Sequence, residues 1–297
     1  MCRILTFGEI IYDVYPDSAV IGGAGLNFAA HCQRCGGQSL FISAVGKDAR
    51  GEEALAEIRS LGLSTDLIKQ NDHPTGRCDV TLGSGGVPTY SIAKDSAYDF
   101  LTLSDEELSR IGEEGCSALC FGTLIQRNDI SSQALRRLVR LGGFAHVVCD
   151  VNLREGCFDK RSAAFCLESA TVLKVSSEEE PKLREMGLYF AKSTDPCEIS
   201  RAICLQYPNI KYLLYTMGEQ GAFVYSVAGG FFLPAKKTSV ASTVGAGDSF
   251  TAAFICSLLK GASVREAAEL AVELSSFVVS RIEAIPDYTV VDGRIVF

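Results

Sequence analysis

The chain of 297 residues is 47% hydrophobic and 22% charged, enough to bury a large core as one α/β domain or as a domain with a small appendage. Asp and Glu (36) outnumber Lys and Arg (28), giving a net charge of −8, and no basic cluster occurs, so nucleic-acid binding is not expected. The sequence has no apolar run of about 18 residues and no signal-peptide layout at its start, which predicts a cytoplasmic protein with no membrane partner.

Short apolar segments recur along the chain and alternate with helix-length segments. The strand-like segments are 3–8, 39–45, 118–122, 146–150, 170–175 and 211–216. The helix-like segments between them include 52–61, 131–141 and 196–206. This alternation predicts a mostly parallel sheet covered by helices on both faces, with ligands at the carboxyl ends of the strands.

Two candidate ligand contacts follow the first strand. Asp13 comes after its carboxyl end, where a carboxylate can accept hydrogen bonds from neighbouring hydroxyls, although an exposed loop Asp is equally common. Gly22 and Gly23 then lead into a helical pattern with Asn27 in its first turn, which suits close backbone approach and hydroxyl binding. Packing alone is the alternative reason for these glycines. A dinucleotide fingerprint fails because Phe28 stands where its third Gly would be, which disfavours an NAD-linked oxidoreductase.

Twelve cysteines are scattered through strand-like and helix-like segments, which favours reduced, mostly buried thiols over a disulfide framework. Cys32-x-x-Cys35 beside His31 raises a zinc or redox alternative. No second ligand pair follows at zinc spacing, so the metal interpretation is disfavoured.

The segment 77–92 breaks the alternation of strand and helix. Two extended stretches flank Gly83-Ser84-Gly85-Gly86, with no helix-like segment to cover them. Because a lone hairpin is marginal in water, we expect it to pair with the extended stretch 11–21 in a small sheet that stands off the main domain. A surface hairpin without a role is the alternative.

Polar residues follow three later strands. Asp150, Asn152 and Arg154 stand on alternate positions, so the pattern predicts that they face one side. Ser176 and Glu179 follow the next strand, where an acidic helix start would look the same. The run from Thr216 through Gly218 to Gly221 ends another strand in a tight turn, which a plain β-turn explains equally well.

The strongest local signal is Gly245-Ala246-Gly247-Asp248, at the start of an apolar-periodic run to Leu259. A helix that begins in small residues exposes its first N–H groups at the positive end of the helix dipole, and such an end binds phosphate. Asp248 in the first turn is placed to take a proton from a hydroxyl that attacks a phosphoryl group. The alternative is that Asp248 only stabilises the helix start.

These stretches resemble the two signatures of the ribokinase-like (PfkB) family of carbohydrate kinases. Gly22, Gly23 and Asn27 match the N-terminal signature, and the segment 242–255 matches the C-terminal D-T-x-G-A-G-D signature with Ser242 where Asp is commonest. The resemblance runs from about Phe7 to Pro286. It implies a three-layer ribokinase-like α/β fold, a single domain over 1–297, with a β lid from about 11–22 and 76–99 that relatives often use to form homodimers.

The resemblance also assigns roles to individual residues. Asp248 is implied as the catalytic base, with the N–H groups of Gly245, Ala246 and Gly247 as an anion hole. The implied sugar contacts are Asp13, Gly22, Gly23, Asn27, Arg154 and Asp248. The implied nucleotide contacts are Ser176, Thr216, Gly218, Gly221 and Gly247. Glu179 is implied to hold Mg²⁺ through water, at a position where relatives carry Asn-x-x-Glu and this chain has Ser176 for the Asn.

Many relatives also bind K⁺ beside the anion hole through backbone oxygens. Here Ser242 replaces the usual Asp and Glu283 replaces a Gly. Glu283 would be strained if it kept a glycine backbone conformation, or its carboxylate would supply the partner of the cation; pointing to solvent is the alternative. We expect K⁺ to matter less here than in relatives.

The expected activity is ATP-dependent phosphorylation of a small ketose. Four stretches look most like the fructokinase branch: Gly8-Glu9 with Asp13, the run 121–124 with Arg127, Asp150-x-Asn152-Leu153-Arg154, and Ala97-Tyr98-Asp99. That branch more often has Ser at Thr123 and Trp at Tyr98. Fructose is therefore the favoured sugar. Kinases of 2-keto-3-deoxygluconate or of other sugars and sugar acids are the alternatives within the family. A catalytically silent sugar-binding regulator is the alternative from another class, and the intact Asp248 argues against it.

Overall fold

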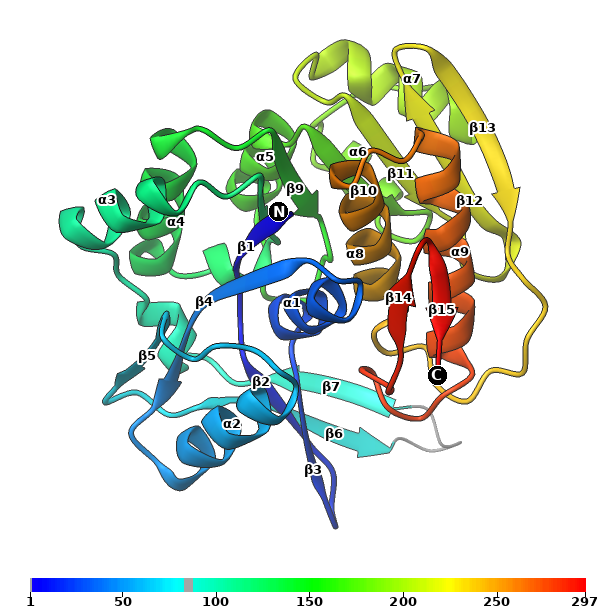
Figure 1. Ribbon diagram of the computed structural model, residues 1–297. Coiled ribbons are helices and arrows are strands. Elements are labelled where there is room, and N and C mark those ends of the chain that lie inside the picture. Colours follow the sequence, from blue (N-terminus) through cyan, green and yellow to red (C-terminus); the bar gives the residue numbers. More distant parts are fainter. Residues whose placement is uncertain (1, 83–87) are drawn as a thin grey trace.

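The main sheet of the protein is nine-stranded within residues 2–82 and 88–297, the part that the computed structural model describes (Figure 1). In sheet order the strands are β13 (Gly229–Pro234), β12 (Gly221–Ser226), β11 (Tyr212–Thr216), β10 (Val172–Ser176), β9 (His146–Asp150), β8 (Ala118–Phe121), β1 (Arg3–Phe7), β4 (Gln38–Gly46) and β5 (Ile68–Asn71). Strands from β11 to β5 pair in parallel, and β12 and β13 extend that sheet antiparallel. The expectation of a mostly parallel sheet is confirmed.

Helices cover both faces of this sheet. They are α1 (Ala24–Arg34), α2 (Ala49–Ser60), α3 (Asp105–Glu114), α4 (Asp129–Leu141), α5 (Lys160–Ser169), α6 (Glu180–Glu185), α7 (Pro196–Gln206), α8 (Ala246–Leu259) and α9 (Val264–Val279). One face is covered by α1, α8 and α9, whose Phe28, Phe254 and Leu274 belong to one buried cluster. The other face carries the helices from α3 to α7, which gives the three layers that the sequence predicted.

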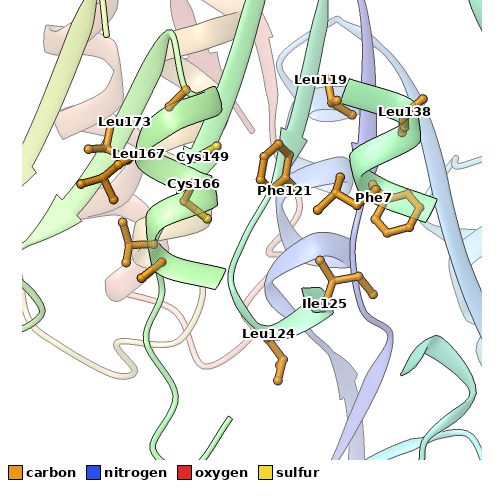
Figure 2. Close-up of a cluster of buried hydrophobic side chains, with 14 of the residues drawn as sticks. Phe7, Leu119, Phe121, Leu124, Ile125, Leu138, Cys149, Cys166, Leu167 and Leu173 are labelled. Atoms are coloured by element: carbon orange, nitrogen blue, oxygen red, sulfur yellow. The ribbon is translucent and has the colours of Figure 1, made fainter. Parts of the chain in front are cut away.

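The core between the sheet and the helices of the second face is apolar and fully enclosed. Phe7 and Phe121 from the strands meet Leu138 of α4 and Leu167 of α5, and all four are at most 2% exposed. Figure 2 shows these side chains gathered between the strands and the helices. Burying such side chains contributes about 1.5–3 kcal/mol each, so this layer holds the strands that carry the site in fixed positions.

Side-chain caps explain most helix starts, but α1 and α8 each begin at a glycine with positive φ and have no such cap. Ser104 caps α3 and Ser263 caps α9, each through a reciprocal box with a Glu three residues later. By contrast, α8 follows Gly245 in a left-handed conformation with φ of 81° and has no side-chain cap. The first N–H groups of α8, which have no partner inside the helix, therefore also lack the side-chain acceptor that a cap would supply.

A smaller four-stranded sheet lies beside the main sheet in the described part of the chain. Its order is β3 (Ala19–Gly22), β2 (Ile11–Val14), β6 (Gly76–Leu82) and β7 (Pro88–Ile92). The pairing of β6 with β2, parallel from Ile11 opposite Gly76, confirms the expected union of the two regions. The predicted turn at Gly83 to Gly86 lies outside the described residues.

The two sheets are joined by a short crossing of the chain. Only Gly8, Glu9 and Ile10 separate β1 from β2. There Gly8 lies against Gly25 at the start of α1, so closely that a Cβ on Gly8 would stand 2.6 Å from the Gly25 Cα. Only glycine permits that contact.

All twelve cysteines fall in the described ranges and are free thiols, most of them buried. Figure 2 shows Cys149 of β9 facing Cys166 of α5. Among the described helices, none is long and apolar enough to cross a membrane.

Candidate active site

A cleft of about 560 Å³ opens between the carboxyl ends of the parallel strands and the smaller sheet. It gathers residues from both glycine-led helix starts and from the segments that follow β1, β9 and β10. The predicted site residues that line it are Asp13, Gly23, Asn27, Arg154, Ser176, Glu179, Gly245, Gly247 and Asp248. Residues more than 200 positions apart in the sequence thus meet in one cavity at the strand ends.

Other predicted residues do not line this cleft. Gly22 pairs with Ile11 inside the smaller sheet, and the Ala246 N–H donates to the Thr243 carbonyl oxygen over a long 3.4 Å. Thr216 ends β11, next to the Ser176 strand, with Gly218 in the turn that follows. Gly221 has φ of 121°, and a Cβ there would stand 2.1 Å from the Leu233 oxygen, so packing between β12 and β13 by itself requires this glycine.

The start of α8 presents backbone donors to the cleft. Gly245 is held in its left-handed conformation against Ala284, whose carbonyl oxygen would lie 2.5 Å from a Cβ at Gly245. In the described residues, no acceptor reaches the N–H groups of Gly247 and Asp248. Two unpartnered N–H groups at a helix start, facing a cleft, form a site for an anion such as phosphate.

Asp248 lies in the first turn of α8 and faces the same cleft. Its Oδ2 accepts a hydrogen bond of 2.9 Å from the Asn27 amide on α1. Burial raises the pKa of Asp248 to about 6, against the lowering effect of Asn27 and of Lys174. At neutral pH the carboxylate is therefore mostly ionised yet basic enough to take a proton.

Lys174 is a site residue that the sequence analysis did not select. It is 7% exposed, its ammonium lies 3.0 Å from Asp150 Oδ1 and 3.9 Å from Glu179 Oε2, and a Cβ at Gly247 would be 3.2 Å from it. Burial lowers the pKa of Lys174, but Asp150 and Glu179 outweigh burial and hold the lysine charged. The available signal was a Lys inside the apolar strand sequence Val-Leu-Lys-Val, because a buried lysine requires charged partners.

The pKa values of the two acidic partners of Lys174 are shifted in opposite directions. Burial raises the pKa of Asp150 to about 6, with Lys174 opposing the rise. For Glu179 burial also raises the pKa, but Lys174 and the N–H groups of Ser176 and Leu153 lower it more, so the net shift is downward. Glu179 accepts these two N–H groups at 2.8 and 2.9 Å, one on each oxygen. It is a firmly ionised carboxylate at the floor of the cleft.

The opposite end of the cleft is formed by β2 and the start of α1. Asp13 is half-buried there, and burial raises its pKa while the nearby Arg154 lowers it. Glu9 is 4% exposed, and its carboxylate faces the N–H groups of Ala24 and Gly25. This end therefore offers carboxylate and amide acceptors next to one guanidinium, a set suited to several neighbouring hydroxyls.

The geometry after β9 corrects one sequence argument. Asn152 has φ of 39°, so the strand does not continue past Asp150 and alternation of side chains does not apply. Asp150, Asn152 and Arg154 all line the cleft nonetheless, because the left-handed turn at Asn152 redirects the chain. Asn tolerates this conformation better than most residues, which accounts for its presence.

Two residues that suggested the fructokinase branch form a buried pair away from the cleft lining. Arg127 donates to both oxygens of Asp99, at 2.8 and 2.7 Å, and its guanidinium lies 5.1 Å from the centre of the Tyr98 ring. Such a bidentate pair ties the turn at Asp99 to the loop after β8. Their contribution to the cleft is support of its wall.

The two departures in the C-terminal signature have ordinary conformations. The Ser242 hydroxyl accepts the Val244 N–H at 3.2 Å. The Glu283 side chain is exposed, and Glu283 is not among the described non-glycine residues with positive φ, which are Asp95, Asn152 and Asp292. Of the three alternatives for Glu283, the structure supports the one in which its side chain points to solvent, without backbone strain.

Comparison with known proteins explains this assembly of residues. Residues 3–289 match the sequence model of the pfkB family carbohydrate kinase. This chain belongs to the pfkB family of carbohydrate kinases. The pfkB-family enzyme described here is an ATP-dependent sugar kinase with the ribokinase-like fold.

Relatives of this kinase act on more than one sugar. It is 26% identical over 283 residues to probable fructokinase-4 of Arabidopsis thaliana, an alignment that covers 89% of this chain and 84% of the plant protein. A fructokinase of Xylella fastidiosa with bound ATP has the same fold, with a TM-score of 0.79 at 19% identity, covering 95% of this chain and 94% of that one. The 2-dehydro-3-deoxygluconokinase of Thermotoga maritima superposes with a TM-score of 0.83 at 20% identity, covering 96% of both chains.

Proposed function

We propose that this kinase transfers the γ-phosphoryl group of ATP to a small ketose, foremost fructose, with Asp248 as the general base. The observation that carries the proposal is the position of the Asp248 carboxylate. It stands beside the N–H groups at the start of α8 that have no acceptor among the described residues, and it accepts a hydrogen bond of 2.9 Å from Asn27 of α1. Base, anion site and hydroxyl-binding end thus converge on one point.

In the proposed reaction, a sugar hydroxyl donates a hydrogen bond to Asp248. Since Oδ2 already accepts from Asn27, Oδ1 is the oxygen left to receive the hydroxyl proton. As the hydroxyl oxygen bonds to the γ-phosphorus, its proton passes to Asp248, the bond from phosphorus to the β,γ-bridging oxygen breaks, and ADP leaves. The N–H groups of Gly245, Ala246 and Gly247 stabilise charge on the transferring phosphoryl oxygens; the weak Ala246 bond to Thr243 is one that a phosphate oxygen can replace.

The charged groups behind the anion site suit both phosphates and Mg²⁺. Three carboxylates, those of Asp150, Glu179 and Asp248, surround the single ammonium of Lys174, so the group as a whole attracts a further cation. The described residues contain no group of three or more His, Cys, Asp or Glu placed to hold a metal directly, which agrees with Glu179 holding Mg²⁺ through water. When bound, Mg²⁺ would neutralise phosphate charge. Lys174 is next to Gly247 and is proposed to contact the transferring phosphoryl group.

The nucleotide contacts beyond the cleft are proposed on position alone. Ser176 lines the cleft, and Thr216 lies beside it on the next strand. Gly218 follows in the turn after Thr216. Gly221 has a packing role of its own, so its substitution would not report on ATP binding.

A second candidate substrate is a sugar acid such as 2-keto-3-deoxygluconate. The observation in its favour is Arg154, an exposed guanidinium at the cleft whose side chain forms no hydrogen bond or ion pair with the described residues. A carboxylate on the substrate would pair with it bidentately. With a neutral ketose, Arg154 would donate hydrogen bonds to hydroxyls but would have no opposite charge to pair with.

An assay that couples ADP release to a visible signal separates the candidates. We expect the highest kcat/KM with fructose in a panel that also contains 2-keto-3-deoxygluconate, glucose and ribose. Arg154→Ala should cost about tenfold or less with fructose, but more with a sugar acid, because only a substrate carboxylate pairs bidentately with the guanidinium and carries the opposite charge. Asp248→Asn measures background ATP hydrolysis. A wild-type preference for the sugar acid, abolished in Arg154→Ala, would replace fructose by that substrate.

A further inference from the structure

One face of α1 contacts both Asp248, the proposed base, and the C-terminal loop behind the start of α8. Asn27 bonds to Asp248 at its start, His31 follows one turn later, and Arg34 closes the helix. Arg34 pairs with Asp287 at 2.8 Å, beyond the loop that contains Ala284. The sequence analysis noted His31 only as a neighbour of the Cys-x-x-Cys motif, and the proposed reaction does not use it.

His31 is completely buried and both of its ring nitrogens are hydrogen-bonded. Nδ1 lies 2.6 Å from the Tyr288 hydroxyl and Nε2 lies 3.0 Å from the Ala284 carbonyl oxygen. A carbonyl oxygen can only accept, so Nε2 must carry the proton. Nδ1 is then the acceptor, and the Tyr288 hydroxyl must donate to it. The two partners together select one tautomer of the ring.

Gly245 packs against the backbone of the same Ala284. A Cβ at Gly245 would stand 2.5 Å from the Ala284 carbonyl oxygen, 3.1 Å from its Cα and 3.2 Å from its carbonyl carbon. Gly245 is the left-handed residue that begins α8 and orients the N–H groups of the anion site. Movement of Ala284 by a few tenths of an ångström would therefore change the orientation of those N–H groups.

We propose that His31 is a positioning residue for phosphoryl transfer: by donating from Nε2 to Ala284, it fixes the loop that holds Gly245 and so the geometry of the anion site. This inference rests on the proposed role of the start of α8 as the phosphate site. Helix α1 then orients the catalytic base through Asn27 and the anion site through His31. The two halves of the catalytic geometry share one rigid support.

The ring is suited to this role because its charge does not change. Burial, with a smaller contribution from Arg34, lowers the pKa of His31 to about 3, although the hydrogen bond to the Ala284 carbonyl opposes this shift. The charged side chains facing it are Arg34 of its own helix and, beyond Arg34, Asp287 of the C-terminal loop. His31 remains a neutral donor across the pH range in which a kinase works.

Three substitutions at one position test the direction of the hydrogen bond. The amide nitrogen of Gln stands as many bonds from Cα as Nε2 does, whereas that of Asn is one bond shorter and reaches only the place of Nδ1. His31→Gln should retain kcat within about threefold of wild type. His31→Asn and His31→Ala should lose at least about tenfold in kcat, with the sugar KM within about twofold, because the loss falls on the transition state. His146→Gln, on β9 away from the cleft, is the matched control and should behave as wild type.

A second measurement needs neither a substitution at His31 nor turnover. The chain has three histidines, so nitrogen-15 NMR of histidine-labelled protein can resolve each ring. The signal that is retained in both His73→Gln and His146→Gln belongs to His31, and it should report a neutral ring protonated at Nε2 from pH 5 to pH 8. If no sugar in the panel is phosphorylated, the proposed function is wrong, but this measurement still shows which ring nitrogen of His31 carries the proton.

Four results would overturn the inference. The first two are a wild-type kcat, counted per folded enzyme, in His31→Ala or in His31→Asn. The third is a His31→Gln enzyme as slow as His31→Asn. The fourth is a His31 ring that carries its proton at Nδ1. A histidine that serves only the stability of the core would lower the free energy of unfolding in all three variants alike and leave kcat of the folded enzyme unchanged.

Discussion

The starts of α1 and α8 look alike in sequence and differ in what their backbone donors face. Each helix follows a glycine with positive φ, 106° at Gly23 and 81° at Gly245, and neither glycine supplies a side-chain cap. At α1 the first N–H groups face the buried Glu9 carboxylate. At α8 no acceptor among the described residues reaches the N–H groups of Gly247 and Asp248.

This difference separates two functions that a glycine-led helix start can have. Where the protein supplies its own carboxylate, the helix dipole is already satisfied, and the helix contributes a side chain, Asn27, to the cleft. Where the protein supplies none, the N–H groups remain available for an external anion. The partner of the backbone donors, rather than the glycines, distinguishes a sugar-binding helix from a phosphate-binding one.

The largest effect is expected from removing the base of the phosphate-binding helix. Asp248→Ala should lower kcat by at least about 10²-fold with little change in sugar affinity, because a general base acts in the transition state. Steady-state kinetics with direct sugar-binding titrations provide the measurement. Turnover close to wild type would remove Asp248 from the mechanism and return it to the role of a helix-stabilising carboxylate.

Adding one methyl group at each glycine compares the two helix starts directly. Gly245→Ala forces a left-handed alanine into Ala284, which would displace the N–H groups of the anion site, and should cost at least about tenfold in kcat. Gly23→Ala meets the Glu9 backbone oxygen at 2.7 Å and should instead raise the sugar KM. Equal effects of both substitutions on the same kinetic constant would contradict the separation of roles.

Side chains of the sugar-binding end should affect one substrate only. Asp13→Ala and Asn27→Ala should each raise the sugar KM by about tenfold, the value of one or two hydrogen bonds, and leave the KM for ATP nearly unchanged. Initial rates with each substrate varied in turn measure both constants. A change confined to the ATP constant would reverse the assignment of the two helices.

The pH dependence should reveal the contact between the helices. Because burial raises the pKa of Asp248 to about 6, kcat/KM should fall as pH drops through about 6 and the base becomes protonated. Asn27 donates to the ionised form and lowers this pKa, so Asn27→Ala should move the acid limb to higher pH. A limb that moves to lower pH, or stays in place, would mean that another group controls it.

The smallest effect is expected from K⁺. With Ser242 and Glu283 in place of the common Asp and Gly, turnover should be similar, within about twofold, in K⁺ and in a bulky organic cation at equal ionic strength. Rates across a concentration series of each salt give the comparison. A large saturable rise specific to K⁺ would show that backbone oxygens retain the site.

Sequence patterns predicted the buried centre of the fold better than its edges. Strands such as β9 and helices such as α7 have the predicted bounds because apolar runs and caps are local signals. The edge strands β5 and β13 and the C-terminal hairpin of β14 (Thr289–Val291) and β15 (Arg294–Val296) were missed, because half-exposed strands carry a weaker pattern.

For the site, the sequence located the residues next to glycines and strand ends but not their partners. Asn27 and Asp248 were selected separately, and only the fold brings an amide and a carboxylate 221 positions apart into contact. Lys174 was missed because its role depends on Asp150 and Glu179, which lie on other segments. The His31 contacts likewise join segments more than 250 positions apart, a distance at which no local pattern operates.

At Gly8, the connection between the two sheets packs directly against the start of α1. Strand β1 pairs with β8 and β4 inside the main sheet, and β2 begins only three residues later, so Gly8, Glu9 and Ile10 form a short connection between the two sheets. This connection packs against Gly25 and places the Glu9 carboxylate at the first turn of α1. A movement of the smaller sheet relative to the main sheet would therefore act directly on the helix that holds Asn27 and His31. The position of the smaller sheet and the orientation of these two side chains would thus change together.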